Sequence, residues 1–108
     1  MSEKYLSIAK DFTITPGGRK KTEGKFSGEE FREKFLEPKV RKAIKNQDKL
    51  ICDLDGCLGY PSSFLDESFG VLGRKLCKEE HVNIFDYIEL QCEDEPSLIE
   101  SIRLYVQG

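Results

Sequence analysis

The sequence predicts an α/β protein with a mixed β-sheet of about four strands flanked by helices. Short segments rich in β-branched and aromatic residues, which are typical of strands, alternate along the chain with longer segments whose apolar residues recur at helical spacing. Loops that contain glycine and proline separate these segments. No interruption divides the 108 residues into two apolar units, so we expect a single domain over residues 1–108.

Two strands and a loop are expected before the first long helix. Tyr5 to Ala9 and Phe12 to Thr15 have strand composition and can form a hairpin or one bent strand. Residues 16–25 contain three glycines, one proline and a basic run, which predicts a loop.

A helix is expected to begin at Ser27, where Ser27-Gly28-Glu29-Glu30 forms a capping box. In such a box the serine hydroxyl accepts from the amide of Glu30, and the Glu30 carboxylate reaches back to the amide of Ser27. Pro38 is unfavourable inside a helix, so we expect a break or kink there and two consecutive helical pieces. Their apolar residues are Phe31, Phe35, Val40, Ala43 and Ile44.

The second half of the chain predicts a central strand, a helix, a further strand and a last helix. Leu50 to Leu54 is an apolar run without alternation, which favours a strand covered on both faces by helices, and Val82 to Leu90 is the further strand. Gly70 and Gly73 fall inside the helix expected between these two strands, where each costs about 1 kcal/mol relative to alanine. Their presence indicates close approach of the helix to a strand or to a partner's backbone. Pro96 suits a first helical turn. The helical stripes are Leu65, Phe69, Leu72 and Leu76, and then Leu98, Ile102, Tyr105 and Val106.

Composition limits the classes of function. With 38% hydrophobic and 34% charged residues the chain fits a globular protein, and Met1 to Lys10 contains no apolar stretch of a signal peptide, so we expect a cytoplasmic location and no membrane partner. The four cysteines lack close pair spacing and are expected to be reduced, without a metal.

The charges are distributed unevenly along the chain. Basic residues dominate Arg19 to Lys45, whereas Glu79 to Ile102 has acidic residues and no Lys or Arg. These opposite charges can steer a protein partner or a second copy. A pI near 5.3 without a known motif argues against nucleic acid.

The most informative stretch is the turn from the central strand to the next helix. Ser62 and Ser63 lie there, where ligands of α/β proteins commonly bind. A phosphoserine would place about −1.5 to −2 charges at the positive end of the helix dipole. A serine hydroxyl at this position can equally serve only to cap the helix.

Carboxylates near this turn have structural and chemical interpretations. Asp66 and Glu67 fall in the first turns of the helix, where the dipole stabilises them, and this favours a structural role over acid–base work. Asp53 and Asp55 flank the end of the strand and can hold a metal together with Asp66, but without a loop signature the pattern favours turn and cap hydrogen bonds.

Other candidates concern ligand contacts. Gly17-Gly18-Arg19 can approach a phosphate or carboxylate, although no Walker ending follows and a plain turn is the alternative. Tyr60 and Phe64 can stack on a ligand or partner, or pack in the core. His81 is the only histidine and has no nucleophile signature near it. We therefore predict neither a catalytic residue nor a cofactor.

These residues resemble a known motif. In the STAS domains of bacterial anti-sigma factor antagonists, a buried strand ending in Asp-Leu leads through a short loop to Asp-Ser-Ser-Gly-Leu at a helix start. Here Asp53-Leu54 and Pro61-Ser62-Ser63-Phe64-Leu65 fall into that register without a gap. Ser63 matches the phosphoacceptor of those domains, while Pro61 and Phe64 replace the Asp and Gly that flank their serine pair.

A wider pattern resembles the STAS-like domain family of unknown function. Its parts are Asp11-Phe12 with Pro16-Gly17-Gly18-Arg19, Phe26-Ser27-Gly28-Glu29-Glu30-Phe31, and Ser62-Ser63-Phe64-Leu65-Asp66-Glu67-Ser68-Phe69-Gly70.

The resemblance implies a STAS-like fold and a non-catalytic regulatory module that docks a protein partner. The docking surface would be the Ser62-Ser63 turn with the helix after it, including Phe64, Asp66 and Glu67, and a histidine-kinase-like ATPase would phosphorylate Ser63. A homodimer is compatible with this interpretation. The alternative is a small-ligand or nucleotide-binding domain that uses the Gly17-Gly18-Arg19 loop and the helix start at Ser62.

Overall fold

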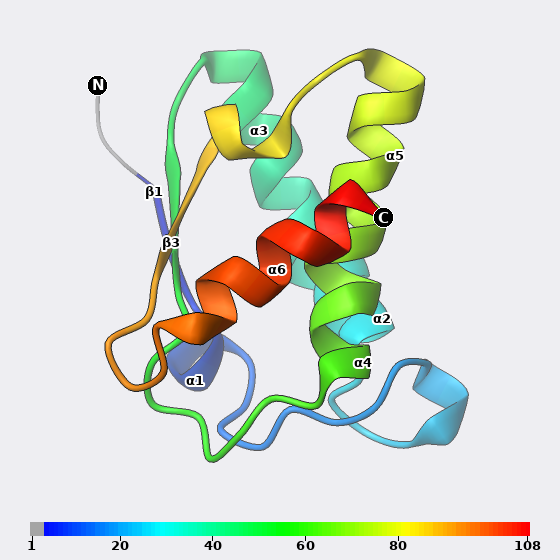
Figure 1. Ribbon diagram of the computed structural model, residues 1–108, viewed down its shortest axis with the longest axis vertical. Coiled ribbons are helices and arrows are strands. Elements are labelled where there is room, and N and C mark those ends of the chain that lie inside the picture. Colours follow the sequence, from blue (N-terminus) through cyan, green and yellow to red (C-terminus); the bar gives the residue numbers. More distant parts are fainter. Residues whose placement is uncertain (1–3) are drawn as a thin grey trace.

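The computed structural model describes residues 4–108 and contains a three-stranded parallel sheet in the order β1-β2-β3 (Figure 1). The strands are β1 (Lys4–Ser7), β2 (Leu50–Asp53) and β3 (Ile88–Gln91). The predicted α/β class and the central position of β2 are confirmed. The expected mixed sheet of about four strands is not confirmed, because the sheet within the described residues has three strands and all of them are parallel.

The expected strand over Phe12 to Thr15 is wrong, because the chain turns into a short helix directly after β1. Ser7 ends the strand and caps α1 (Ile8–Asp11): its Oγ accepts from the amide of Lys10 at 3.1 Å. Its own amide donates to Oδ2 of Asp11 at 2.9 Å. The residues that follow are irregular, and Phe12 packs its ring 5.3 Å from that of Phe31. Tertiary packing therefore overrides strand propensity here.

The first long helix consists of α2 (Gly28–Phe31), a π-helical turn over Arg32–Leu36 and α3 (Glu37–Asn46). Half of the predicted capping box is present: Oγ of Ser27 accepts from the amide of Glu30 at 3.1 Å. The Glu30 carboxylate lies 3.3 Å from Nζ of Lys34 instead of capping Ser27. Pro38 follows the wide turn, so the two predicted pieces join without a break.

The second long helix has the same construction, with α4 (Ser62–Leu65), a π-helical turn over Asp66–Gly70 and α5 (Val71–Glu80). A Cβ on Gly73 would lie 2.7 Å from Cγ1 of Val106. The predicted close approach is thus present, but it involves the last helix rather than a strand or a partner. The predicted stripe is fully buried: Leu65, Phe69, Leu72 and Leu76.

The expected strand over Val82 to Leu90 begins later than predicted. Residues Ile84–Asp86 form a 3-10 turn that the Asn83 side chain caps by accepting from the amide of Phe85 at 3.0 Å, and β3 starts only at Ile88. The last helix, α6 (Ser97–Gln107), is present as expected, but Pro96 is its N-cap residue and not part of its first turn.

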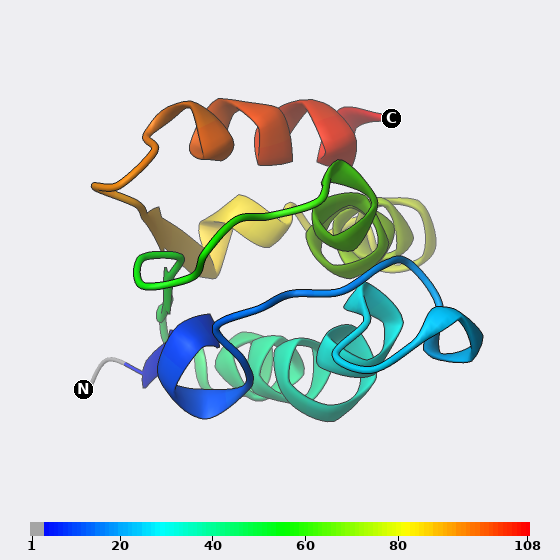
Figure 2. The ribbon, with the colours of Figure 1, turned by 90° about the horizontal axis from the view of Figure 1, so that it is seen from below.

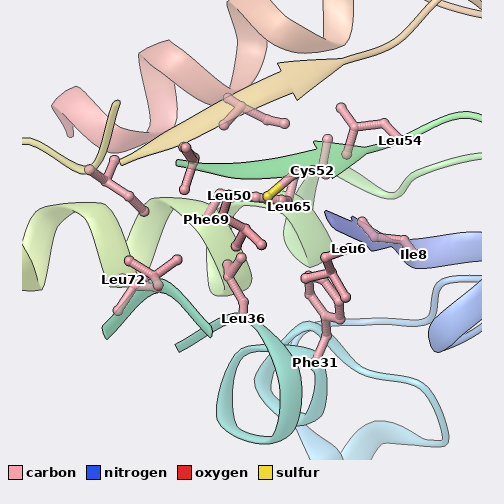
Figure 3. Close-up of a cluster of buried hydrophobic side chains, with 14 of the residues drawn as sticks. Leu6, Ile8, Phe31, Leu36, Leu50, Cys52, Leu54, Leu65, Phe69 and Leu72 are labelled. Atoms are coloured by element: carbon pink, nitrogen blue, oxygen red, sulfur yellow. The ribbon is translucent and has the colours of Figure 1, made fainter. Parts of the chain in front are cut away.

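All long helices lie on one face of the sheet. Because strand order follows chain order and β-α-β connections are right-handed, both connecting helices must lie on the same side. Figure 2 shows α3, α5 and α6 together on that side. The core between sheet and helices contains ten residues labelled in Figure 3, which are Leu6, Ile8, Phe31, Leu36, Leu50, Cys52, Leu54, Leu65, Phe69 and Leu72.

The prediction that β2 is covered on both faces is wrong. Its side chains alternate between buried Leu50 and Cys52 and half-exposed Ile51 and Asp53. The sequence shows no alternation because Ile51 is apolar although it points away from the core. None of the helices within residues 4–108 has the length and apolar content needed to cross a bilayer. The sequence expectation for Met1 to Lys10 falls partly on residues 1–3, which lie outside the described residues.

Candidate functional site

The loops that follow β1 and β2 run side by side. The amide of Leu58 donates to the carbonyl of Ile14 at 2.8 Å, which joins the two loops. The first loop then folds back on itself, and the amide of Gly28 donates to the carbonyl of Gly18 at 2.9 Å. A Cβ on Gly17 would collide with the carbonyl of Lys25, so this glycine permits a backbone contact inside the protein.

This folding brings Arg19 to the second long helix. Nη1 of Arg19 donates to Oδ2 of Asp66 at 2.8 Å, and Nη1 of Arg74 donates to Oδ1 of the same carboxylate at 2.9 Å. Gly70 makes room for this pair, since a Cβ there would lie 2.6 Å from Oδ1 of Asp66. Burial alone raises the pKa of Asp66, but the hydrogen bonds from the two arginines outweigh it and lower the pKa below its usual value.

Glu67 is the buried carboxylate of the same cluster, with 4% of its surface exposed. Its Oε2 accepts from Nη1 of Arg32 at 2.6 Å and from Nζ of Lys20 at 3.3 Å. Arg32 also donates to the carbonyl of Glu67 at 2.8 Å. Burial alone raises the pKa of Glu67, but the hydrogen bonds from Arg32 and Lys20 outweigh it and lower the pKa. The neighbouring carboxylates of Asp66 and Glu67 thus fasten the basic loop and the first long helix to the second.

A hollow of about 380 Å³ opens where this cluster meets the C-terminal helix. Arg19 and Arg74 lie on its wall with 38% and 37% of their side chains exposed. Arg74 is held by its second contact, a 2.5 Å hydrogen bond from Nη1 to the carbonyl of Tyr105. We call this surface the arginine hollow; its lining residues are Arg19, Ser62, Asp66, Arg74, Leu104, Tyr105 and Gly108.

The two serines begin the helix but do not cap it, so the capping prediction is wrong. Pro61 is the N-cap residue, with extended backbone, and its carbonyl accepts from the amide of Phe64 at 3.0 Å. The serines take the first two helical positions. Ser62 is exposed and lines the arginine hollow, whereas Ser63 is half-buried and does not.

The aromatic candidates differ in burial: Phe64 is fully buried, whereas Tyr60 is half-buried. Phe64 stacks on Phe31 with ring centroids 5.7 Å apart. The Tyr60 hydroxyl donates to the carbonyl of Leu54 at 2.7 Å and contacts Sγ of Cys57 at 3.1 Å, and its burial raises its pKa. Tyr60 therefore tethers the loop that leads to the serines.

Asp53 and Asp55 make turn hydrogen bonds. Asp53 accepts from the amide of Asp55 at 2.9 Å, and Asp55 accepts from the amides of Glu93 and Asp94, both at 2.8 Å. The two backbone donors lower the pKa of Asp55. Within residues 4–108 no group of three or more His, Cys, Asp or Glu side chains is arranged to hold a metal ion. The candidates thus divide into those at the arginine hollow (Arg19, Ser62 and Asp66) and those elsewhere.

Sequence reasoning missed Arg74 and Arg32. Arg74 follows Asp66 by eight residues, so both lie on one side of the helix, and this spacing was a usable signal. No local pattern connects Arg32 with Glu67, which are 35 residues apart.

Comparisons with known proteins give a family assignment. A family model described as STAS-like domain of unknown function (DUF4325) matches residues 27–94. This stretch includes the Ser27 cap, β2, the serine pair and the Asp66–Glu67 anchor, but it ends before α6 and begins after Arg19. No curated protein and no solved structure matches the chain.

Proposed function

Because the chain belongs to the family of STAS-like domains of unknown function, we propose that it is a regulatory protein-interaction module whose partner docks at the arginine hollow. One observation carries this proposal. The loop and helix motifs that define the sequence pattern, far apart along the chain, meet at one open surface through the contact of Arg19 with Asp66.

The surface has the chemistry of a docking site. Within the described residues, the side-chain hydrogen bonds of Arg19 and Arg74 all come from Nη1, which leaves the N–H groups on Nε and Nη2 for a partner. Leu104 adds an apolar contact, being 57% exposed. Arginine beside apolar side chains is typical of the residues that dominate binding energy at protein interfaces.

Binding rather than catalysis fits these groups. Asp66 is the acidic residue lining the hollow, and two guanidinium groups already occupy its carboxylate. A general base needs a free lone pair within reach of the proton that it removes.

Phosphorylation by a histidine-kinase-like ATPase is the proposed means of regulation. A phosphoryl group on Ser62 would add about −1.5 to −2 charges to a hollow that contains Arg19 and Arg74. The resemblance to anti-sigma factor antagonists selects Ser63, but exposure favours Ser62.

Affinity enrichment from a lysate of the source organism tests the docking proposal. Ser62→Trp blocks the hollow with a bulky side chain at an exposed position, and Ser97→Trp is the matched control at the first residue of α6. We expect the wild type and Ser97→Trp to retain the same specific proteins and Ser62→Trp to lose them. Equal retention by all three proteins contradicts the proposal.

A second candidate function is binding of a small anionic ligand, such as a nucleotide, at the same surface. It is favoured by the two arginines and the Ser62 hydroxyl lining one hollow. A ligand at 100 times its dissociation constant stabilises a protein by about 2.7 kcal/mol, which a thermal-shift panel of phosphates and nucleotides detects. A flat panel, or shifts that persist in Arg19→Gln, removes this candidate.

A further inference from the structure

The face of the sheet opposite the helices has its own set of side chains. The register places Tyr5 beside Ile51 and Ile51 beside Glu89, and Asp53 lies beside Gln91 one step further along. These five residues alternate with the core residues of the strands and point away from the helices. We call them the outer face.

The outer face is open within the described part of the chain. Tyr5 is 50% exposed, Glu89 and Gln91 are exposed, and Ile51 is half-exposed. Figure 2 shows the long helices only on the other side of the strands. Parallel sheets almost always have both faces covered, so this sheet lacks one layer.

The charge on this face is negative. Within residues 4–108, no lysine or arginine forms an ion pair with Asp53 or Glu89. Asp53 accepts instead from the hydroxyl of Tyr5. This hydrogen bond, followed by burial and by the charges of Asp53, Asp11 and Asp55, raises the pKa of Tyr5. Lys4 begins β1 and Lys49 precedes β2, so both lie at the opposite end of the strands from Asp53, and the Lys49 ammonium donates to the carbonyl of Asp86.

We propose that the outer face is a second interaction surface, which binds a cationic amphipathic helix of a partner protein. A helix is the usual layer that covers a sheet face, and its apolar stripe would cover Tyr5 and Ile51. Lysine or arginine on either side of the stripe would then meet Asp53 and Glu89. The surface is separate from the arginine hollow, which is lined by other residues.

The negative charge of the outer face argues against a second copy of the chain, a membrane surface or a nucleic acid as its partner. A two-fold dimer through this face would place the carboxylates of Asp53 and Glu89 near those of the other copy, and like charges disfavour that arrangement. An anionic membrane surface or a nucleic acid would be repelled for the same reason.

The test is an NMR titration of the full chain with a synthetic leucine–lysine helical peptide, and with a leucine–glutamate peptide of the same pattern as control. We expect the lysine peptide alone to shift the amide signals of Tyr5, Ile51 and Glu89. Glu89→Lys should weaken binding about tenfold, because it reverses a charge at the contact. Glu100→Lys makes the same charge change on an exposed residue of α6 and should leave binding unchanged.

Several outcomes overturn the inference. They are no signal shifts at millimolar peptide, shifts confined to the arginine hollow, or equal affinity of Glu89→Lys and wild type. Self-association that Glu89→Lys abolishes in sedimentation would also overturn it, since the occupant would then be a second copy. The Ser62→Trp variant should bind the peptide normally, so failure here is independent of the arginine hollow.

Discussion

Replacing Glu67 by glutamine removes the charge that fastens the basic loop and the first long helix to the second. Glu67 and Arg32 have only 5% and 14% of their side chains exposed, and their atoms Oε2 and Nη1 are 2.6 Å apart. Breaking a buried ion pair by removing one partner costs about 3–5 kcal/mol. Lys20 and Arg19 are 48% and 38% exposed, so solvent screening leaves their contacts with Glu67 a small contribution.

Glutamine can still accept a hydrogen bond from Arg32, so we expect a loss of about 2–4 kcal/mol for Glu67→Gln. A domain of this size has a total stability of about 5–15 kcal/mol, so the effect should be large. The midpoint of thermal unfolding should fall by at least about 8 °C. Urea denaturation at pH 7 measures the loss directly.

The pH dependence supplies a second measurement. The pKa of Glu67 is lowered in the folded protein, so its contribution is present above the unfolded pKa of about 4.3 and is lost as the pH falls through the folded pKa. The stability difference between wild type and Glu67→Gln should therefore shrink below about pH 4.

The control for this experiment is Glu80→Gln, which breaks a 2.7 Å ion pair between Glu80 and Arg41 at the surface. These side chains are each 38% exposed, so the variant should unfold almost like the wild type. The reasoning is refuted if Glu67→Gln is no less stable than Glu80→Gln, or if its difference from wild type does not change with pH.

Three further predictions concern packing, capping and thiol reactivity. Gly28→Ala should lose about 1–3 kcal/mol in urea denaturation, because a Cβ there would lie 2.6 Å from the carbonyl of Phe64, whereas Gly59→Ala meets no atom within 4 Å and should be neutral. Ser27→Ala should lose about 1 kcal/mol by the same assay, since its hydroxyl caps α2; no loss would contradict the capping role. Burial raises the pKa of Cys52 to about 12, so at pH 8 a thiol reagent should label exposed Cys77 and reach Cys52 only in denaturant, as mass spectrometry of the labelled peptides would show.

Much of the fold could be predicted because it is encoded locally. The helix that follows Ser62 shows its buried stripe at 3.6-residue spacing, and the run from Leu50 to Leu54 marks the central strand. Both signals arise from burial of a continuous face, which sequence periodicity reports directly.

The errors arise where local composition and tertiary contact disagree. Phe12 to Thr15 has strand residues, but the hydrogen bonds of Ser7 with Lys10 and Asp11 turn the chain into a helix before that segment, and Phe12 then packs on Phe31. Ile51 is apolar and yet points away from the helices, which conceals the open face of the sheet. The face of the sheet to which a strand side chain points depends on how the strand pairs with its neighbours, and the sequence of one strand alone does not show that pairing.

Several residues of the arginine hollow could be predicted from the sequence, but not that they lie next to one another. The sequence pointed to Arg19, Ser62 and Asp66 separately, each for a local reason. Their meeting depends on an ion pair between residues 47 positions apart in the chain, and on Arg74 from the next turns of the helix. Long-range contacts of this kind follow from the path of the loop, which its glycines allow but do not specify.

Site-specific photo-crosslinking gives the most direct test of the arginine hollow as the docking surface. A photoreactive phenylalanine analogue would replace Ser62 in one variant and exposed Ser97 in another, and both proteins would be irradiated in a lysate of the source organism. The account predicts a discrete adduct with a specific protein from position 62 and none from position 97. The absence of an adduct from position 62, or the same adducts from both positions, would contradict it.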